Sequence, residues 1–449
     1  MKLNYSNYSQ VNLPGIKKIA FNRKLVPDFI FFLSVVALPS SFFNFVDRTV
    51  FVDLRLLFLF VGDLYLIFNI KKLEKISKIK GGKLLILLTI FAFFKVIHSI
   101  TFQNIHWIEV LTIFRTNFFF PIVSLGFLCY AAKMDNNRLY RFFYWLLLVT
   151  FFQGILYIIA NLSGFNFYAN TSKEFQEFQG TTIIQNLQSL PDYNIILFSF
   201  SLLTVFIVSQ FKKHWLWLTP LIVTILSIVR NQMIVYVLIL LTLYTFGMFS
   251  SLKIGASKIV KAFFILALCS LVALFIFPAH IGRVINKFGF DKEKQISASS
   301  YTEEGTYKFR LNLIEEAYDR TERNNNLLLG NGYMREGTKG EYDFVGGGDT
   351  LIAPVIFTEG LLGVFIRCLP VIYFLLFGFK NLRNKNKRIT LFALLIIALI
   401  IPEILNAVQT KIFVYYHHVL LIIYLLTMIL YNDKQIQKKI IANNSIIEI

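Results

Sequence analysis

Long apolar runs alternate with short polar stretches along almost the whole chain. A helix needs roughly 17 to 25 mainly apolar residues to cross a bilayer, and about twelve runs come close to or meet this length. They are residues 27–45, 54–70, 84–100, 111–132, 142–160, 193–210, 215–229, 233–249, 262–277, 352–376, 389–405 and 414–431. The pattern predicts an all-α, polytopic integral membrane protein with about twelve transmembrane helices.

Lysine and arginine gather in alternate connections between these runs. The basic segments are residues 17–24, 71–83, 133–141, 212–213, 253–261, 380–388 and 434–439. Because short basic loops are retained on the cytoplasmic side, this alternation predicts that both termini are cytoplasmic.

One outward connection, between the ninth and tenth spans, is much longer than the others. It covers residues 279–349, roughly 70 residues, and loops of this length are usually functional or disordered. Phe309, Leu313 and Ala317, with Leu311, Ile314 and Tyr318 beside them, have the spacing of an amphipathic helix. The predicted division is therefore a cytoplasmic segment 1–26, spans in 27–278, the outward loop 279–349, spans in 350–431 and a cytoplasmic tail 432–449.

Composition supports lipid as the main solvent. Hydrophobic residues make up 56% of the 449 residues, charged residues 16%, and the mean hydropathy is +0.61. The net charge of +19 does not indicate a nucleic-acid partner, because the basic residues lie between apolar runs rather than on a soluble face. With no HExxH motif, no outward Asp-x-Asp pair and no Cys/His cluster, we expect neither a metal site nor a cofactor.

Ionisable residues inside the spans require a partner or a role, because a lone charge in lipid costs several kcal/mol. Arg115, Glu359 and Glu403 fall in the outer parts of their spans, whereas Asp63 is close to mid-membrane. For Lys95 and Arg367, we expect ion pairing within the bundle or snorkelling at helix ends.

Two arginines on the outward side are candidates for anion binding. Arg230 lies in the tight turn after residue 229, and Arg310 lies in the amphipathic loop helix. Each has a structural alternative. The Arg230 side chain could snorkel to the membrane interface, and Arg310 could pair with Glu315 or Glu316. Together, two guanidinium groups match the oxygens of a lipid pyrophosphate.

Asp349 is a candidate general base, since it follows three glycines at the start of a span and would lie at the boundary of water and lipid. Its structural alternative is a helix cap. His417 and His418, near the outer end of the last span, are secondary candidates for the base. Tyr333 is one of several loop tyrosines that could stack on sugar rings or simply pack within the loop.

The order of these features resembles the Wzy-type O-antigen and capsule polymerases, whose scaffold the O-antigen ligases share. The resemblance rests on the topology and on five segments. These are Ser227-Ile228-Val229-Arg230, the helix from Phe309-Arg310 to Glu316-Ala317, Leu329-Gly330-Asn331-Gly332, Asp349, and Thr358-Glu359-Gly360-Leu361-Leu362-Gly363. It implies a GT-C-like membrane fold.

The resemblance also implies a metal-independent, inverting glycosyl transfer at the outer face of the bacterial inner membrane. The growing glycan chain on undecaprenyl pyrophosphate would be passed to an incoming lipid-linked repeat unit, with membrane lipid and a chain-length regulator protein as further partners. Arg230 and Arg310 would hold the pyrophosphate and Asp349 would be the base. Arg115, Glu359 and Tyr333 are the predicted substrate-binding residues.

Three alternatives stay open. An O-antigen ligase would transfer finished glycan to lipid A core, but the ligases place a histidine where this chain has Asp349. A transporter or flippase for lipid-linked sugars would favour internal repeats and broken helices, and we find no repeat in the sequence. A non-enzymatic membrane scaffold is the third.

The predicted topology can be tested by labelling. A cysteine placed in residues 279–349 is expected to react in intact cells with a membrane-impermeant maleimide, whereas a cysteine in 71–83 should react only after the cells are opened. Protection of the 279–349 cysteine in intact cells would reverse the assignment.

Overall fold

The computed structural model describes residues 25–37, 60–113, 120–143, 175–178, 181–184, 230–252, 303–334, 352–406 and 420–436, with a few isolated residues between them. The helices are α1 Leu25–Ala37, the 3₁₀ turn η3 Ile70–Lys72, α3 Leu73–Lys78, α4 Gly82–Thr101, α5 Trp107–Ile113, α6 Phe120–Ala131, α10 Arg230–Phe249, α13 Glu303–Arg323, α14 Ile352–Asn381 and α15 Lys387–Asn406. Residues 60–69, 136–143 and 420–436 are also helical.

A short hairpin is the exception to this helical architecture. Strands β1 Phe175–Phe178 and β2 Thr181–Ile184 pair antiparallel, with Phe175 opposite Ile184. The hairpin lies in the connection between the predicted spans 142–160 and 193–210. The prediction of a helical protein is otherwise confirmed for the described residues.

Two of the described helices are long and apolar enough to cross a membrane, namely α4 and α14. The predicted spans 84–100 and 352–376 match them closely, and α4, with 20 residues, is about 30 Å long. Several other predicted spans, among them 193–210 and 215–229, lie outside the described residues, so the number of spans stays a prediction.

The polarity of α4 and α14 is inverted relative to a soluble helix. Large apolar side chains are exposed along both, including Ile90 (60%) on α4 and Leu376 (64%) on α14. The charged side chains of Lys95, Glu359 and Arg367 are buried instead. Water would favour the opposite arrangement, whereas a bilayer favours this one, because lipid solvates apolar side chains and not charges.

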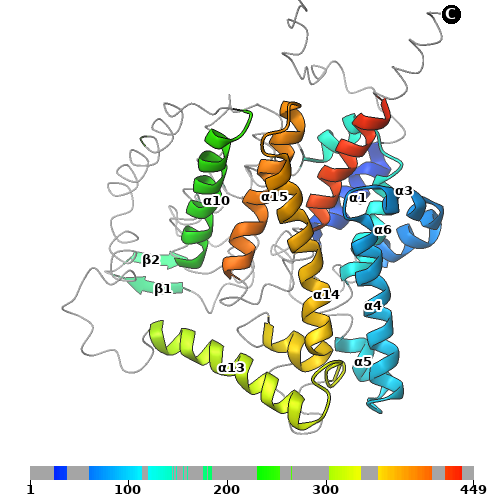
Figure 1. Ribbon diagram of the computed structural model, residues 1–449, viewed down its shortest axis with the longest axis vertical. Helices are drawn as coiled ribbons and strands as arrows, with labels where there is room; N and C mark the ends of the chain where they lie inside the picture. The colour runs from blue at the N-terminus through cyan, green and yellow to red at the C-terminus, as the bar shows by residue number, and fades with distance from the viewer. Residues whose placement is uncertain are drawn as a thin grey trace, which may run out of the picture.

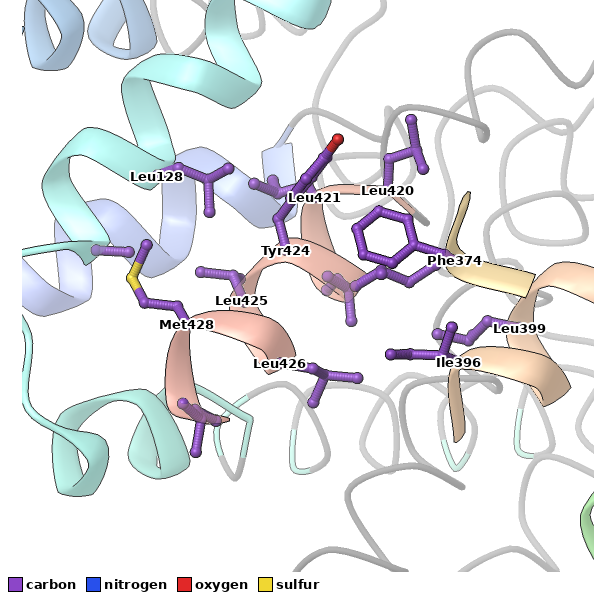
Figure 2. Packing of buried hydrophobic residues seen from close by; sticks show 14 of the residues in the cluster. Leu128, Phe374, Ile396, Leu399, Leu420, Leu421, Tyr424, Leu425, Leu426 and Met428 are labelled. Atoms are coloured by element: carbon purple, nitrogen blue, oxygen red, sulfur yellow. The ribbon is translucent and has the colours of Figure 1, made fainter. Parts of the chain in front are cut away.

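The helix at residues 420–436 forms the centre of the main hydrophobic core. Tyr424, Leu425 and Met428 are fully buried there, and Figure 2 shows Phe374 of α14 beside Tyr424. The rings of Phe374 and Tyr424 meet edge to face with centroids 5.2 Å apart, and the Tyr424 hydroxyl donates to the Gly81 carbonyl oxygen at 3.1 Å. A helix that is apolar on all sides is buried in this way by its neighbours.

The basic loops meet at one end of the molecule. Lys75 Nζ donates to the Ala132 carbonyl oxygen at 2.7 Å, and Arg388 pairs with Asp433 at 2.9 Å. The backbone N–H of Ser251 donates to the carbonyl oxygen of Leu382 at 3.0 Å. Helices α5 and α13 lie at the opposite end (Figure 1). The basic segments that the structure describes, 71–83, 133–141 and 380–388, are thus grouped in space, while the side each end faces stays a prediction.

Candidate functional site

The predicted site residues differ in how far the structure describes them. Asp349 and Arg115 lie outside the described residues, as do His417 and His418. Arg230 is the first residue of α10 and Arg310 lies within α13, but their side chains are outside the described part. The same holds for the side chain of Glu403. Glu359 and Tyr333 are fully described, and they are in direct contact.

The contact lies at a break in α14. Gly360 has φ 69° and ψ −171°, a conformation accessible almost only to glycine, so α14 consists of two helical segments joined at this residue. A break of this kind leaves backbone C=O groups unpaired on one side and N–H groups unpaired on the other.

The segment that follows α13 fills the break and satisfies both sets of groups. We call residues 327–334 the insertion loop. The backbone N–H groups of Asn331 and Gly332 donate to the carbonyl oxygens of Phe357 and Thr358, at 2.7 and 3.0 Å. In return, Leu361 and Leu362 donate to the carbonyl oxygens of Leu327 and Leu328, at 3.0 and 3.1 Å. The exchange of these four hydrogen bonds fixes the insertion loop to α14.

Glycines make this close approach possible. A Cβ atom on Gly330 would lie 2.5 Å from the backbone nitrogen of Gly360, and a Cβ on Gly360 would lie 2.5 Å from the backbone nitrogen of Gly330. Gly363, one turn later, leaves room for the Glu359 side chain, which a Cβ there would approach to 2.2 Å. The two glycine-containing segments 329–332 and 358–363 therefore pack directly against each other.

A buried ion pair lies beside the break. The Arg367 guanidinium donates from Nε to Glu359 Oε2 at 2.7 Å and from Nη2 to Oε1 at 2.5 Å. The Tyr333 hydroxyl donates to the same Oε1 at 2.6 Å. Glu359 and Tyr333 have no exposed surface, and the Arg367 side chain is 7% exposed. Of the two alternatives expected for Arg367, ion pairing and snorkelling, the structure shows the ion pair, and its bidentate geometry is the strongest form of this interaction.

Helix α4 supplies the other wall of the site. The Lys95 ammonium donates to the Leu329 carbonyl oxygen and lies 3.1 Å from His98 Nδ1. Ser99 Oγ accepts a hydrogen bond from the backbone N–H of Tyr333 at 2.9 Å and donates to the Lys95 carbonyl oxygen at 2.6 Å. Lys95 bonds a backbone carbonyl 234 positions away, a contact that no local sequence pattern could predict.

Helix α13 is attached to the same cluster. Leu313, Ala317 and Thr321 are buried on one face of α13, which confirms the predicted amphipathic helix; Leu311 and Tyr318 are exposed. The Asn331 side chain joins helix to loop, because its Nδ2 lies 3.5 Å from Thr321 Oγ1. Its Oδ1 accepts hydrogen bonds from the side chains of Asn324 and Asn326, at 3.2 and 3.1 Å.

The charged groups of this cluster form hydrogen bonds with other groups of the protein. Both oxygens of the Glu359 carboxylate are occupied by donors from the protein itself, and the substrate-binding role predicted for Glu359 and Tyr333 stays a prediction. In the part of the chain that the structure describes, no three His, Cys, Asp or Glu residues lie close enough together to hold a metal ion.

Replacing Gly360 with alanine is expected to destabilise the protein, because an L-residue is strained at this φ and its Cβ would clash with the backbone of Gly330. Strain of this kind costs about 1–3 kcal/mol. The melting temperature in detergent should fall, whereas Leu361→Ala, at an exposed neighbouring position, should lower it much less. Equal melting temperatures for Gly360→Ala and the wild type would contradict the packing described for the break.

The comparisons with known proteins assign no family to this chain. A search against protein-family models found no match, and neither did a search of curated proteins.

Proposed function

We propose that this chain is a membrane glycosyltransferase that joins undecaprenyl-pyrophosphate-linked oligosaccharide units into O-antigen or capsular polysaccharide. The observation that supports the proposal most is the attachment of α13 to the broken helix α14 through the insertion loop. An enzyme acting on lipid-anchored substrates needs its polar groups held at the membrane boundary, and an amphipathic helix fixed to a transmembrane helix provides such a position.

The backbone positions of the two arginines agree with a shared anion site. The end of α10 near Ser251 contacts the basic loop at Leu382, so Arg230, at the other end of α10, lies about 30 Å away along the helix axis. Helix α13, which carries Arg310, also lies at the end of the molecule opposite the basic loops (Figure 1). The backbone of both arginines therefore lies at the end of the molecule that we assign to the outer face.

In the proposed reaction, a sugar hydroxyl of the incoming lipid-linked repeat unit attacks the anomeric carbon that joins the growing glycan chain to undecaprenyl pyrophosphate. The bond between that carbon and the pyrophosphate oxygen breaks, and the electron pair remains on the pyrophosphate. Arg230 and Arg310 stabilise this developing charge, while Asp349 accepts the hydroxyl proton. Arg115 is assigned to substrate binding. The enzyme resides in the bacterial inner membrane with both termini in the cytoplasm.

A transporter for lipid-linked sugars is the second candidate, and the break in α14 favours it. Transporters use the free ends of broken helices to bind their substrates. Here four backbone groups at the break are bonded to the insertion loop instead. We therefore rank glycosyl transfer first. An O-antigen ligase remains the alternative within the same scaffold.

The function can be tested by complementing a deletion strain. The deletion should leave glycans of a single repeat unit if the chain is a polymerase, and no surface glycan if it is a transporter or a ligase. Arg230→Ala and Arg310→Ala should each reduce elongation on the order of a hundredfold, because an oxyanion-stabilising donor is worth this much. The measurement is the size distribution of surface glycan on a gel, with membrane insertion of each variant verified.

Arg323→Ala is the matched control. Arg323 lies in the last turn of α13, its side chain is 77% exposed, and it should be replaceable without loss of chain length. Glycans of normal length in both the Arg230 and the Arg310 variants would contradict the pyrophosphate site.

A further inference from the structure

The contacts around the insertion loop connect it to two helices, α4 and α14. Glu359 and Arg367 come from α14, Lys95 and Ser99 from α4, and Tyr333 from the loop itself. We call these five residues the loop lock. None of them except Tyr333 belongs to the outward loop, so the lock connects the outward loop to the interior of the membrane domain.

The ion pair holds the loop because Tyr333 completes it. Arg367 occupies both carboxylate oxygens of Glu359, and the Tyr333 hydroxyl shares Oε1. If the loop withdrew, the Glu359 carboxylate would lose one of its donors inside an apolar surrounding. A buried charge deprived of a donor is unfavourable, so the pair favours the inserted state of the loop.

Lys95 acts on the same loop from the opposite side. Its ammonium group is fully buried and donates to the Leu329 carbonyl oxygen, and it is within electrostatic range of Glu359. Withdrawal of the loop would remove this acceptor from a buried cation. Buried groups of both signs therefore each lose one hydrogen-bond partner when the loop withdraws.

The lock extends to α13 through Asn331. The Asn331 backbone N–H is bonded to Phe357 of α14, and its side chain contacts Thr321 of α13. Ala317, one turn before Thr321, is fully buried in the same cluster. Arg310 lies seven residues before Ala317, which is about 10 Å along the axis of the same continuous helix. The position of the insertion loop therefore determines the position of the α13 backbone at Arg310.

We propose that Glu359 is a positioning residue: its buried pair with Arg367 keeps the insertion loop in the break of α14 and thereby holds α13, with Arg310, in place at the membrane boundary. The effect on the loop is a physical property of this chain. Its consequence for glycan length rests on the proposed function.

The test measures backbone amide exchange in the full-length protein in detergent, by mass spectrometry of peptides covering 327–334 and 357–362. Glu359→Gln keeps the shape of the side chain but leaves Arg367 without its counter-charge. We expect the amides of Asn331, Gly332, Leu361 and Leu362 to exchange about tenfold faster or more, because local opening becomes easier. Tyr333→Phe, which deletes one hydroxyl, should give a smaller increase in the same peptides and is a second test if Glu359→Gln fails to fold.

Two further variants separate this role from a general loss of stability. The double variant Glu359→Gln with Arg367→Met removes both partners of the ion pair and should return exchange toward the wild-type rate, because position 367 then no longer carries a buried charge without its counter-charge. Glu316→Gln is the matched control. It breaks an exposed Glu–Arg pair on α13 with Arg320, and exchange of both peptides should stay within about twofold of the wild type.

The same variants are then assayed for glycan length in the deletion strain. Faster exchange together with shorter chains in Glu359→Gln supports the proposal. Unchanged exchange in both Glu359→Gln and Tyr333→Phe overturns it, and short chains without faster exchange also overturn it in favour of direct contact of Glu359 with substrate. Faster exchange with normal chain length overturns the positioning of Arg310. If the deletion strain itself has normal glycan, the proposed function fails, and the exchange measurement still decides on the loop lock.

Discussion

The exchange of backbone hydrogen bonds between the insertion loop and the break in α14 is the constraint on which the described site depends. Four N–H groups and four carbonyl oxygens, half of them from each segment, satisfy one another where a continuous helix would have bonded internally. Unpaired backbone groups are costly in an apolar environment, so a membrane helix can be interrupted only where something replaces its lost bonds. Here a loop connected to an amphipathic helix does so, and the two parts of the protein become one unit.

The buried charges follow from that constraint. Glu359, Arg367 and Lys95 lie on the inner faces of α4 and α14, where donors and acceptors from the insertion loop reach them, while the outer faces of both helices are apolar. Each of the two helices thus presents apolar side chains on its outer face, where lipid would lie, and paired polar side chains on its inner face. The cluster is fully occupied by the protein's own groups, which favours a role in holding the loop over a role in binding a substrate.

Much of the helical architecture could be predicted from the sequence. The apolar runs 84–100 and 352–376 correspond to α4 and α14, and the spacing of Leu313 and Ala317 predicted α13. Among the described residues, the basic segments 71–83, 133–141 and 380–388 lie at one end of the molecule, which agrees with their alternation along the chain. The hairpin of β1 and β2 was not predicted, because its strands are only four residues long, too short for a clear period-2 pattern.

The sequence by itself determined which segments avoid water and which residues are chemically out of place among them, because hydropathy and charge are properties of each residue. Only the tertiary structure decided the partners. That Glu359 pairs with Arg367, that Tyr333 completes the pair, and that Lys95 bonds the Leu329 carbonyl oxygen depend on a loop entering a helix break. Gly330 and Gly360 are separated by 30 positions, and their contact arises from packing, for which no local pattern carries information.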